Sequence, residues 1–257
     1  MKGEKDMFEI KDLSFSYSKK DFTLKSISLS LSKNCINVLF GKNGCGKSTM
    51  LKCVMGLLKV KEGIVNIDEE DFLSLSQVKK ARLVSYLPQE IASSNLSVMN
   101  TLLLGRLPYQ GRLTNDENLK KIETVSKELH IEELLDKNID ELSIGQRQKV
   151  MIAKALVQES KYILLDEPTS SLDIQNQAKV LSLLKQLCDD KRINVLLSMH
   201  DINLGLKYGK RFFCMKDGQI IFDGYKEDIS EQALRETFET NLRLKQDGRQ
   251  KFVLLGE

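Results

Sequence analysis

A glycine-rich stretch with two lysines and two adjacent hydroxyl residues lies near residue 45. It reads FGKNGCGKST from Phe40 to Thr49, and it contains the pattern G-x-x-x-x-G-K-[ST]. Glycines allow a tight turn whose N–H groups point inward, and these groups form a concave positive site together with the following helix start. The sequence therefore predicts a loop that binds a polyphosphate. Its candidate residues are Gly41, Lys42, Asn43, Gly44, Cys45, Gly46, Lys47, Ser48 and Thr49.

Two side chains of this loop have distinct expected roles. The Lys47 ammonium would reach the β- and γ-phosphates, and the Ser48 hydroxyl would hold Mg²⁺. The flanking pattern agrees, because an apolar run at 36–40 predicts a strand and 48–58 has helical spacing. Cys45 has two interpretations: a small residue that fills space, or a thiol whose oxidation would block nucleotide binding.

A pair of carboxylates follows a second apolar run. Residues 161–165 read KYILL, as expected of a central strand that is buried on both faces, and Asp166, Glu167 and Pro168 come next. Ligands bind at the carboxyl ends of such strands. Asp166 is predicted to hold Mg²⁺, directly or through water, and Glu167 to activate a water as general base. The alternative is an acidic pair that only caps a helix.

Three further side chains are weaker candidates. Gln89 follows a predicted strand at 81–87 and could ligate Mg²⁺ or orient a water, or be an ordinary loop residue. His200 ends a predicted strand at 193–199 and could contact a γ-phosphate. Tyr17 ends the first strand pattern, and its ring either stacks on a purine or makes an ordinary cross-strand contact.

A second anion site is predicted at the start of another helix. Ser143 and Gly145 precede a helical pattern at 146–158, with Gln146 as its first residue. A hydroxyl and an open glycine backbone at a helix N-terminus favour an anion. By itself the feature could be no more than a helix cap.

The remaining patterns predict how these residues are positioned. Alternation over 7–31 indicates antiparallel strands, whereas 91–160 is helical in spacing, with a Thr114–Glu117 capping box. A D-G turn joins strands at 211–215 and 219–222, followed by a helix at 227–240 and a last strand at 252–255. The fold class is α/β, with an antiparallel β subdomain before the core and a helical subdomain inserted in it.

Composition narrows the function classes. The 257 residues carry 39 basic and 36 acidic groups, and this net charge of +3 gives no argument for nucleic acid. Five cysteines without a C-x-x-C spacing indicate a reduced, cytosolic protein without a disulfide framework or zinc site. No window approaches the length of a membrane span, and the first residues lack a signal-peptide core.

Taken in order, GKNGCGKST, Gln89, LSIGQ, YILLDEP, SSLD and His200 make the chain resemble the nucleotide-binding subunits of ATP-binding cassette (ABC) transporters. The resemblance covers about 7–241, with the helical subdomain at about 91–160 inserted in a P-loop NTPase (RecA-like) core, and leaves a tail at 242–257. Ile144 stands where the family more often has glycine.

The resemblance implies an ATPase that uses ATP and Mg²⁺ and works as a dimer. Two copies would face head to tail, so that the phosphate loop of one and Ser143, Gly145 and Gln146 of the other clamp each ATP. Tyr17 would stack on adenine, Ser48, Gln89 and Asp166 would serve Mg²⁺, and Glu167 would be the base. His200 would sense the γ-phosphate, and Asp173 would cross the dimer interface.

The segment TLLLGRLPYQGRL and the stretch HDINLGLKYGKR are similar to importers of iron-siderophore, haem or cobalamin, the metal-chelate group. The resemblance then implies two membrane permease subunits, contacted through Gln89 and about 99–109, and indirectly a substrate-binding protein. The chain would sit on the cytoplasmic face of the membrane. Alternatives are a transporter of zinc, manganese, phosphonate or lipid, a non-transport ABC ATPase in iron–sulfur assembly or DNA repair, and a nucleotide-binding regulator.

Overall fold

The core is a six-stranded sheet with the order β10-β9-β3-β8-β7-β6, in which only the edge strand β10 runs antiparallel to its neighbour. The computed structural model describes residues 8–18, 23–89, 95–190, 193–248 and 250–256. The strands of the core are β3 (Ile36–Phe40), β6 (Val84–Leu87), β7 (Tyr162–Asp166), β8 (Asn194–Met199), β9 (Arg211–Lys216) and β10 (Gln219–Tyr225).

Strands β3, β7 and β8 are buried along their whole length, which explains why they read as continuous apolar runs. Alternate residues of β7 enter two different hydrophobic clusters, one on each face of the sheet: Tyr162 and Leu164 on one side, Ile163 and Leu165 on the other. The expected α/β core is therefore present.

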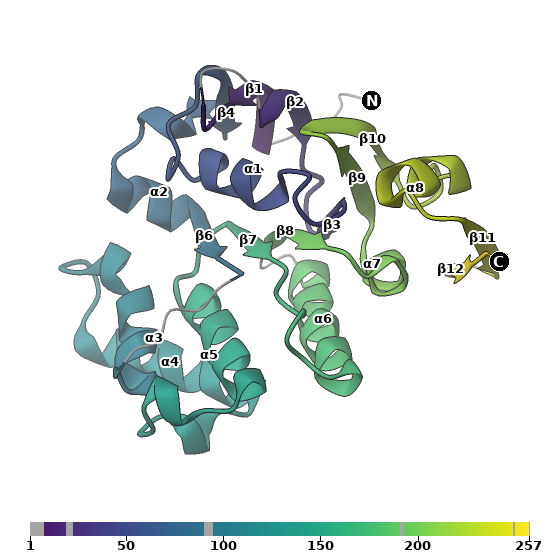
Figure 1. The fold of residues 1–257 in the computed structure, drawn as a ribbon. Helices are drawn as coiled ribbons and strands as arrows, with labels where there is room; N and C mark the ends of the chain where they lie inside the picture. Colours follow the sequence, from purple (N-terminus) through teal and green to yellow (C-terminus); the bar gives the residue numbers. More distant parts are fainter. Residues whose placement is uncertain (1–7, 19–22, 90–94, 191–192, 249, 257) are drawn as a thin grey trace.

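A second sheet covers one face of the core. It is antiparallel, with the order β2-β1-β4-β5, and contains β1 (Phe8–Phe15), β2 (Leu24–Ser30), β4 (Glu62–Ile67) and β5 (Glu70–Asp71). Helix α1 (Lys47–Val54) lies between this sheet and the core in Figure 1, and its apolar residues join the cluster shared by both. The helix is shorter than the predicted 48–58, because Gly56 adopts φ 71° and the chain turns away.

The opposite face of the core is covered by α5 (Ile144–Val157), α6 (Ile174–Asp189) and α7 (Ile202–Tyr208). Together with α3 (Val98–Gly105) and α4 (Asn115–Leu129), α5 forms the predicted helical block below the sheet in Figure 1. The capping box of α4 is confirmed, since Thr114 and Glu117 exchange side-chain and backbone hydrogen bonds. Residues 90–94, near the predicted start of the block, lie outside the described part of the chain.

Several predicted boundaries were wrong. Residues 81–83 are not strand but the end of α2 (Gln77–Leu83), because Ser76 caps a helix there and only four residues remain to pair with β7. Within the stretch 91–160, whose spacing predicted helix, residues 132–134 form only a single 3-10 turn, Glu132–Leu134. Similar turns occur at Phe72–Ser74, Leu107–Tyr109 and Ile139–Glu141. Ser230 caps the helix expected at 227–240, which is α8 (Glu231–Phe238).

The segment after 241 is more ordered than a tail. It forms a hairpin of β11 (Leu242–Asp247) and β12 (Gln250–Leu255), which lies beside α8 and near both the C-terminus and α7 in Figure 1. Leu244 and Val253 pack against the main hydrophobic cluster. The Asn203 amide of α7 exchanges hydrogen bonds with both the N–H and the carbonyl of Val253 (2.7 and 3.2 Å). The hairpin is therefore fastened to the core.

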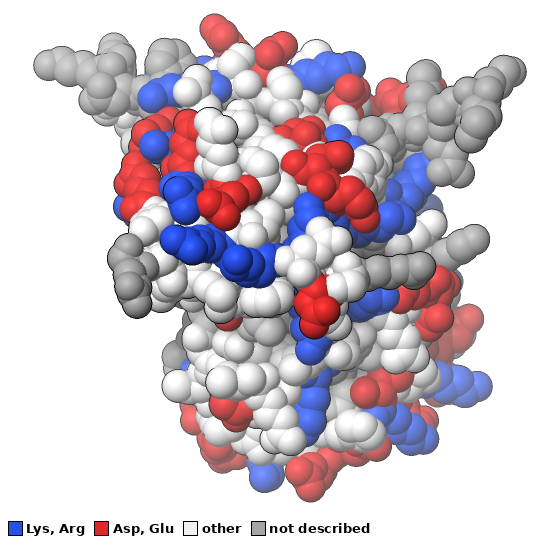
Figure 2. All heavy atoms as spheres, turned by 90° about the vertical axis from the view of Figure 1, so that its right-hand side faces the viewer, with Lys and Arg blue, Asp and Glu red and all other residues white. Residues whose placement is uncertain are grey.

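The surface charge and the lengths of the helices bear on what the protein can contact. Figure 2 shows the face that carries α8 and the hairpin, where Lys and Arg side chains are interspersed with Asp and Glu rather than gathered into one broad basic area. No helix among the described residues has both the length and the apolar composition that crossing a membrane requires.

Candidate functional site: the phosphate loop and the carboxyl ends of the core strands

The glycine-rich loop connects β3 to α1, as predicted. Gly44 and Gly46 have φ angles of 82° and 112°, a left-handed backbone that other residues adopt only with strain. A Cβ on Gly41 would lie 2.5 Å from Cys45 Sγ and 2.8 Å from the carbonyl oxygen of Met215. The three glycines are thus required by geometry, and they leave the loop open toward the start of α1.

Lys47 is the first residue of α1 and is almost completely buried. Its ammonium donates hydrogen bonds to the carbonyl oxygens of Gly41 (2.7 Å) and Lys42 (3.1 Å). It also forms an ion pair with Glu167, at 3.4 Å. The positive charge is therefore held inside the loop, where polyphosphate oxygens would meet it.

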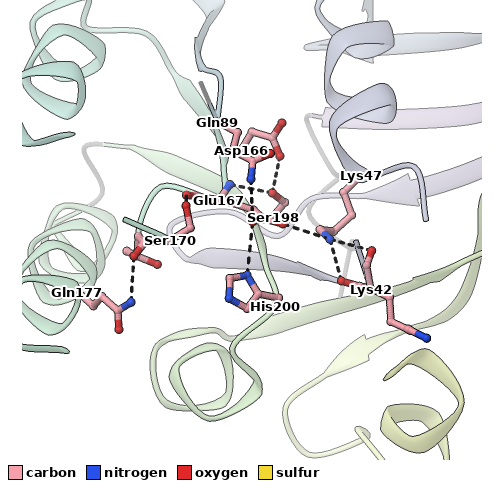
Figure 3. Close-up of polar contacts among 11 residues, drawn as sticks. Lys42, Lys47, Gln89, Asp166, Glu167, Ser170, Gln177, Ser198 and His200 are labelled. Atoms are coloured by element: carbon pink, nitrogen blue, oxygen red, sulfur yellow. Dashed lines mark hydrogen bonds and ion pairs between the residues drawn. The ribbon is translucent and has the colours of Figure 1, made fainter. Parts of the chain in front are cut away.

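The acidic pair lies at the carboxyl end of β7, next to the phosphate loop (Figure 3). Asp166 is 1 % exposed, and its carboxylate accepts a hydrogen bond from the Ser198 hydroxyl (2.7 Å). The same Ser198 oxygen accepts the N–H of Glu167 (2.9 Å). Glu167 has φ 48°, so the chain turns sharply there and the two carboxylates point in different directions.

Three segments far apart in the sequence supply polar neighbours to the Glu167 carboxylate. Gln89 Nε2 donates to Oε2 at 3.2 Å, His200 Nδ1 lies 3.4 Å from the same oxygen, and Lys47 approaches Oε1. Figure 3 shows these side chains converging between the strand ends. The structure thus brings together the predicted residues Lys47, Gln89, Glu167 and His200.

A cavity of about 450 Å³ opens in front of this cluster. Tyr17 lies at its edge with its ring 65 % exposed, packed edge-on against Phe15 with its hydroxyl 3.4 Å from the Thr49 hydroxyl. A ring presented in this way is free to stack on a planar base. The cavity is lined by Tyr17, Thr23, Asn43, Gly44, Gly46, Lys47, Ser48, Thr49, Gln89 and Glu167.

The second predicted anion site is separate. Ser143 is the N-cap of α5, where its hydroxyl accepts the Gln146 N–H (3.3 Å) and Gln146 Oε1 accepts the Ser143 N–H (3.0 Å). The described lining of the cavity does not include Ser143, Gly145 or Gln146. Helix α5 belongs to the helical block below the core sheet in Figure 1, whereas the phosphate loop leads into α1, which lies above the sheet. Asp173, the exposed N-cap of α6, is likewise not part of the cavity lining.

Comparison with known proteins shows the family. The ABC transporter family model matches residues 24–170. The chain belongs to the ABC transporter family, as its ATP-binding component. An iron chelatin transport ATP-binding protein of Helicobacter pylori is 37% identical over 83% of this chain and 85% of its own length.

A phosphonates import ATP-binding protein of Wolinella succinogenes is 33% identical, and the match covers 98% of this chain and 95% of that protein. A bacterial ABC transporter cassette solved as a dimer is 27% identical with a TM-score of 0.78, covering 87% of this chain and all of the other. The resemblance and the fold class predicted from the sequence are confirmed, and this ABC subunit binds and hydrolyses ATP.

The oxygen atoms of the ABC site suit magnesium. A Ser48 hydroxyl, an Asp166 carboxylate and a Gln89 amide are hard ligands of the kind that Mg²⁺ prefers, and few protein ligands suffice when phosphates supply the rest. No cluster of three or more His, Cys, Asp or Glu side chains able to hold a metal occurs within the described residues. Bound there, Mg²⁺ would offset the negative charge of the phosphates.

Sequence reasoning missed two contributors. Ser198 was hidden inside the apolar run INVLLSM, where its polarity was the available signal, because a buried hydroxyl in a central strand needs partners. Glu239, at the end of α8, pairs with Lys42 of the phosphate loop (2.7 Å) and with Lys216 (3.3 Å). Nothing in its local sequence predicts this contact, which depends on how α8 folds back over the core.

Proposed function

We propose that this ABC ATPase is the motor of a metal-chelate importer, acting as a pair of copies with two membrane permease subunits. The observation that carries the proposal is the separation of two anion sites in one chain. The phosphate loop lines the cavity, whereas the helix start at Ser143 does not. A second copy, related by a two-fold axis, would place Ser143, Gly145 and Gln146 over the ATP of the first.

Within that arrangement each side chain has a task. Lys47 binds the β- and γ-phosphates, Tyr17 stacks on adenine, and Glu167 accepts the proton of the attacking water. His200 and Gln89, which both contact the Glu167 carboxylate, orient it toward the γ-phosphate. Ser48, Gln89 and Asp166 would hold Mg²⁺. Asp173, exposed at the start of α6, would face the partner copy.

Helix α3 and the turn after it provide a surface for a permease. Leu104 and Leu107 are 40 and 55 % exposed there, so two large apolar side chains are available for contact with a partner. The nearby Arg106 is buried, and its guanidinium donates to Asn118 Oδ1 (3.0 Å), Glu159 Oε2 (2.8 Å) and the Val157 carbonyl.

Tyr109 makes this surface rigid. Its ring contacts the guanidinium groups of both Arg106 (4.5 Å to the ring centroid) and Arg82 (5.5 Å). Arg82, from α2, also donates to the carbonyl of Pro108 (2.8 Å). Such cation–π contacts tie the turn to both α2 and α5, so that a force applied at the turn would reach the core.

The substrate class rests on kinship. The iron chelatin relative supports a metal chelate, and the phosphonate relative keeps phosphonate import as the second candidate. The chain would lie on the cytoplasmic face of the membrane through its permease partners, with a substrate-binding protein as an indirect partner.

The test is ATP turnover by the complete transporter in lipid vesicles, with the binding protein loaded with ferric siderophore, haem, cobalamin, phosphonate or zinc in separate samples. We expect one metal chelate to stimulate turnover several-fold and the other ligands to leave it at the basal rate. Stimulation by phosphonate or by zinc alone would refute the metal-chelate assignment.

A further inference from the structure

Three polar side chains form a row at the carboxyl ends of neighbouring strands of the core sheet. In the parallel register Tyr86 of β6 pairs with Leu164 of β7, and Asp166 pairs with Ser198 of β8. Side chains two residues apart on a strand point to the same face, so Asp166 shares the face of Leu164 and therefore that of Tyr86. Tyr86 therefore lies diagonally from Asp166, two residues back in the register, and Tyr86, Asp166 and Ser198 share the face that also carries α1.

One oxygen of the Asp166 carboxylate already accepts a hydrogen bond. The buried Ser198 hydroxyl occupies Oδ1 of the carboxylate, at 2.7 Å. A carboxylate has two oxygens and accepts several hydrogen bonds, so this contact leaves capacity on the side of β6.

The other flank is occupied by Tyr86. Its hydroxyl is buried from solvent, yet it has no hydrogen-bond partner among the described residues. The Asp166 carboxylate is the charged group next to this hydroxyl, at a geometry that falls short of a full hydrogen bond. A buried hydroxyl without a partner costs roughly 1–3 kcal/mol, a cost that phenylalanine would avoid at the same position. We therefore expect the Tyr86 hydroxyl to gain a hydrogen-bond partner in another state of the site, such as the nucleotide-bound state.

We propose that Tyr86 is a positioning residue of the ATPase, whose hydroxyl donates to the Asp166 carboxylate once the metal–nucleotide complex is bound. Hydroxyls from the two flanking strands then hold the carboxylate on both sides and fix the direction in which it faces the metal. Ser198 provides one and Tyr86 the other. The inference rests on the metal-binding role of Asp166 under the proposed function.

The test uses Mn²⁺ as a paramagnetic substitute for Mg²⁺, with a non-hydrolysable ATP analogue and the full chain. Electron paramagnetic resonance measures the Mn²⁺ affinity of the wild type, Tyr86→Phe, Asp166→Asn and the matched control Tyr208→Phe. Tyr208 lies on α7, and its hydroxyl contacts Ser182 (3.2 Å) rather than the site. Affinity for the analogue in EDTA and the melting temperature are measured for each variant.

We expect Tyr86→Phe to weaken Mn²⁺ binding about tenfold, the worth of one hydrogen bond to a charged group, without changing affinity for the analogue in EDTA. Tyr208→Phe should leave both affinities unchanged. Mn²⁺ affinity equal in the two Tyr→Phe variants would overturn the inference. So would a loss of metal-free nucleotide binding or of thermal stability in Tyr86→Phe beyond that of Tyr208→Phe, because it would assign the residue to packing.

Asp166→Asn tests the proposed metal site separately from the role of Tyr86. If it abolishes Mn²⁺ binding while Tyr86→Phe has no effect, the metal site stands and the role of Tyr86 is wrong. If it leaves Mn²⁺ binding unchanged, the proposed metal site itself is wrong and the role of Tyr86 fails with it.

Discussion

Replacing Glu167 by glutamine tests the assignment of the general base. The amide has nearly the same shape, and glutamine adopts the left-handed backbone of this position (φ 48°) no less readily than glutamate. The change removes a negative charge that faces Lys47 at 3.4 Å, and it removes the proton acceptor. Contacts with Gln89 and His200 can be kept by the amide with its groups reoriented.

Two free-energy terms decide the outcome. At an effective dielectric constant of about 20, the direct attraction between Lys47 and Glu167 is about 5 kcal/mol, but desolvation of both groups offsets most of it. Lys47 also keeps two carbonyl acceptors, so we expect a loss of folding stability of only about 1–2 kcal/mol. Loss of a general base slows catalysis by about 10²–10⁴, which corresponds to about 3–5 kcal/mol in the activation barrier. The effect on turnover should therefore exceed the effect on stability.

ATP affinity, unlike turnover and stability, should not fall in Glu167→Gln. Glu167 competes with the phosphates for the Lys47 ammonium, so its neutralisation should leave ATP affinity unchanged or raise it. With hydrolysis blocked, the ATP-bound dimer should accumulate. Turnover is measured as phosphate release, affinity by calorimetry and dimerisation by light scattering. Glu123→Gln is the matched control, because Glu123 is exposed on α4 and pairs with Lys127 of the same helix.

Turnover of Glu167→Gln within about twofold of the wild type would refute the base assignment. A fall in ATP affinity that parallels the fall in turnover would refute the argument about Lys47, since it would mean that the carboxylate supports nucleotide binding.

The remaining predictions concern the second half-site, the hairpin and Cys45. Ser143→Arg should abolish the ATP-bound dimer in light scattering without weakening ATP binding to the monomer, because Ser143 does not line the cavity; an equal loss of monomer affinity would contradict the two-site clamp. Removing residues 242–257 exposes the surface under Leu244 and Val253, so urea unfolding should show a loss of about 3 kcal/mol or more; an unchanged midpoint would show that the hairpin does not contribute. Burial raises the pKa of Cys45 more than Lys47 lowers it, so the reactive thiolate forms only above the ordinary pKa and maleimide labelling at pH 8 should be slower than that of free cysteine, and slower again with ATP. Labelling as fast as that of free cysteine would instead favour the interpretation of Cys45 as a reactive thiol whose oxidation blocks nucleotide binding.

Much of the nucleotide-binding site could be predicted from the sequence alone. The phosphate loop needs glycine where φ is positive and lysine at the start of the helix, and these are local requirements that a short pattern expresses completely. The strands before it and before Asp166 were equally clear, because burial on both faces demands an unbroken apolar run. Ser143 was correctly placed at the N-terminus of α5, although the helix begins at Ile144 and not at the predicted Gln146.

Only the tertiary structure determines which of the predicted site residues contact one another. Glu167 contacts Lys47, Gln89 and His200 because β3, β8, β7 and β6 are neighbours in that order, and strand order is not written in any local pattern. The neighbours of Asp166 depend on a parallel register that pairs it with Ser198 and places Tyr86 diagonally from it on the same face of the sheet. A shift of one residue would have turned both away. The anchoring of the last hairpin to α7 depends in the same way on contacts between residues about fifty positions apart.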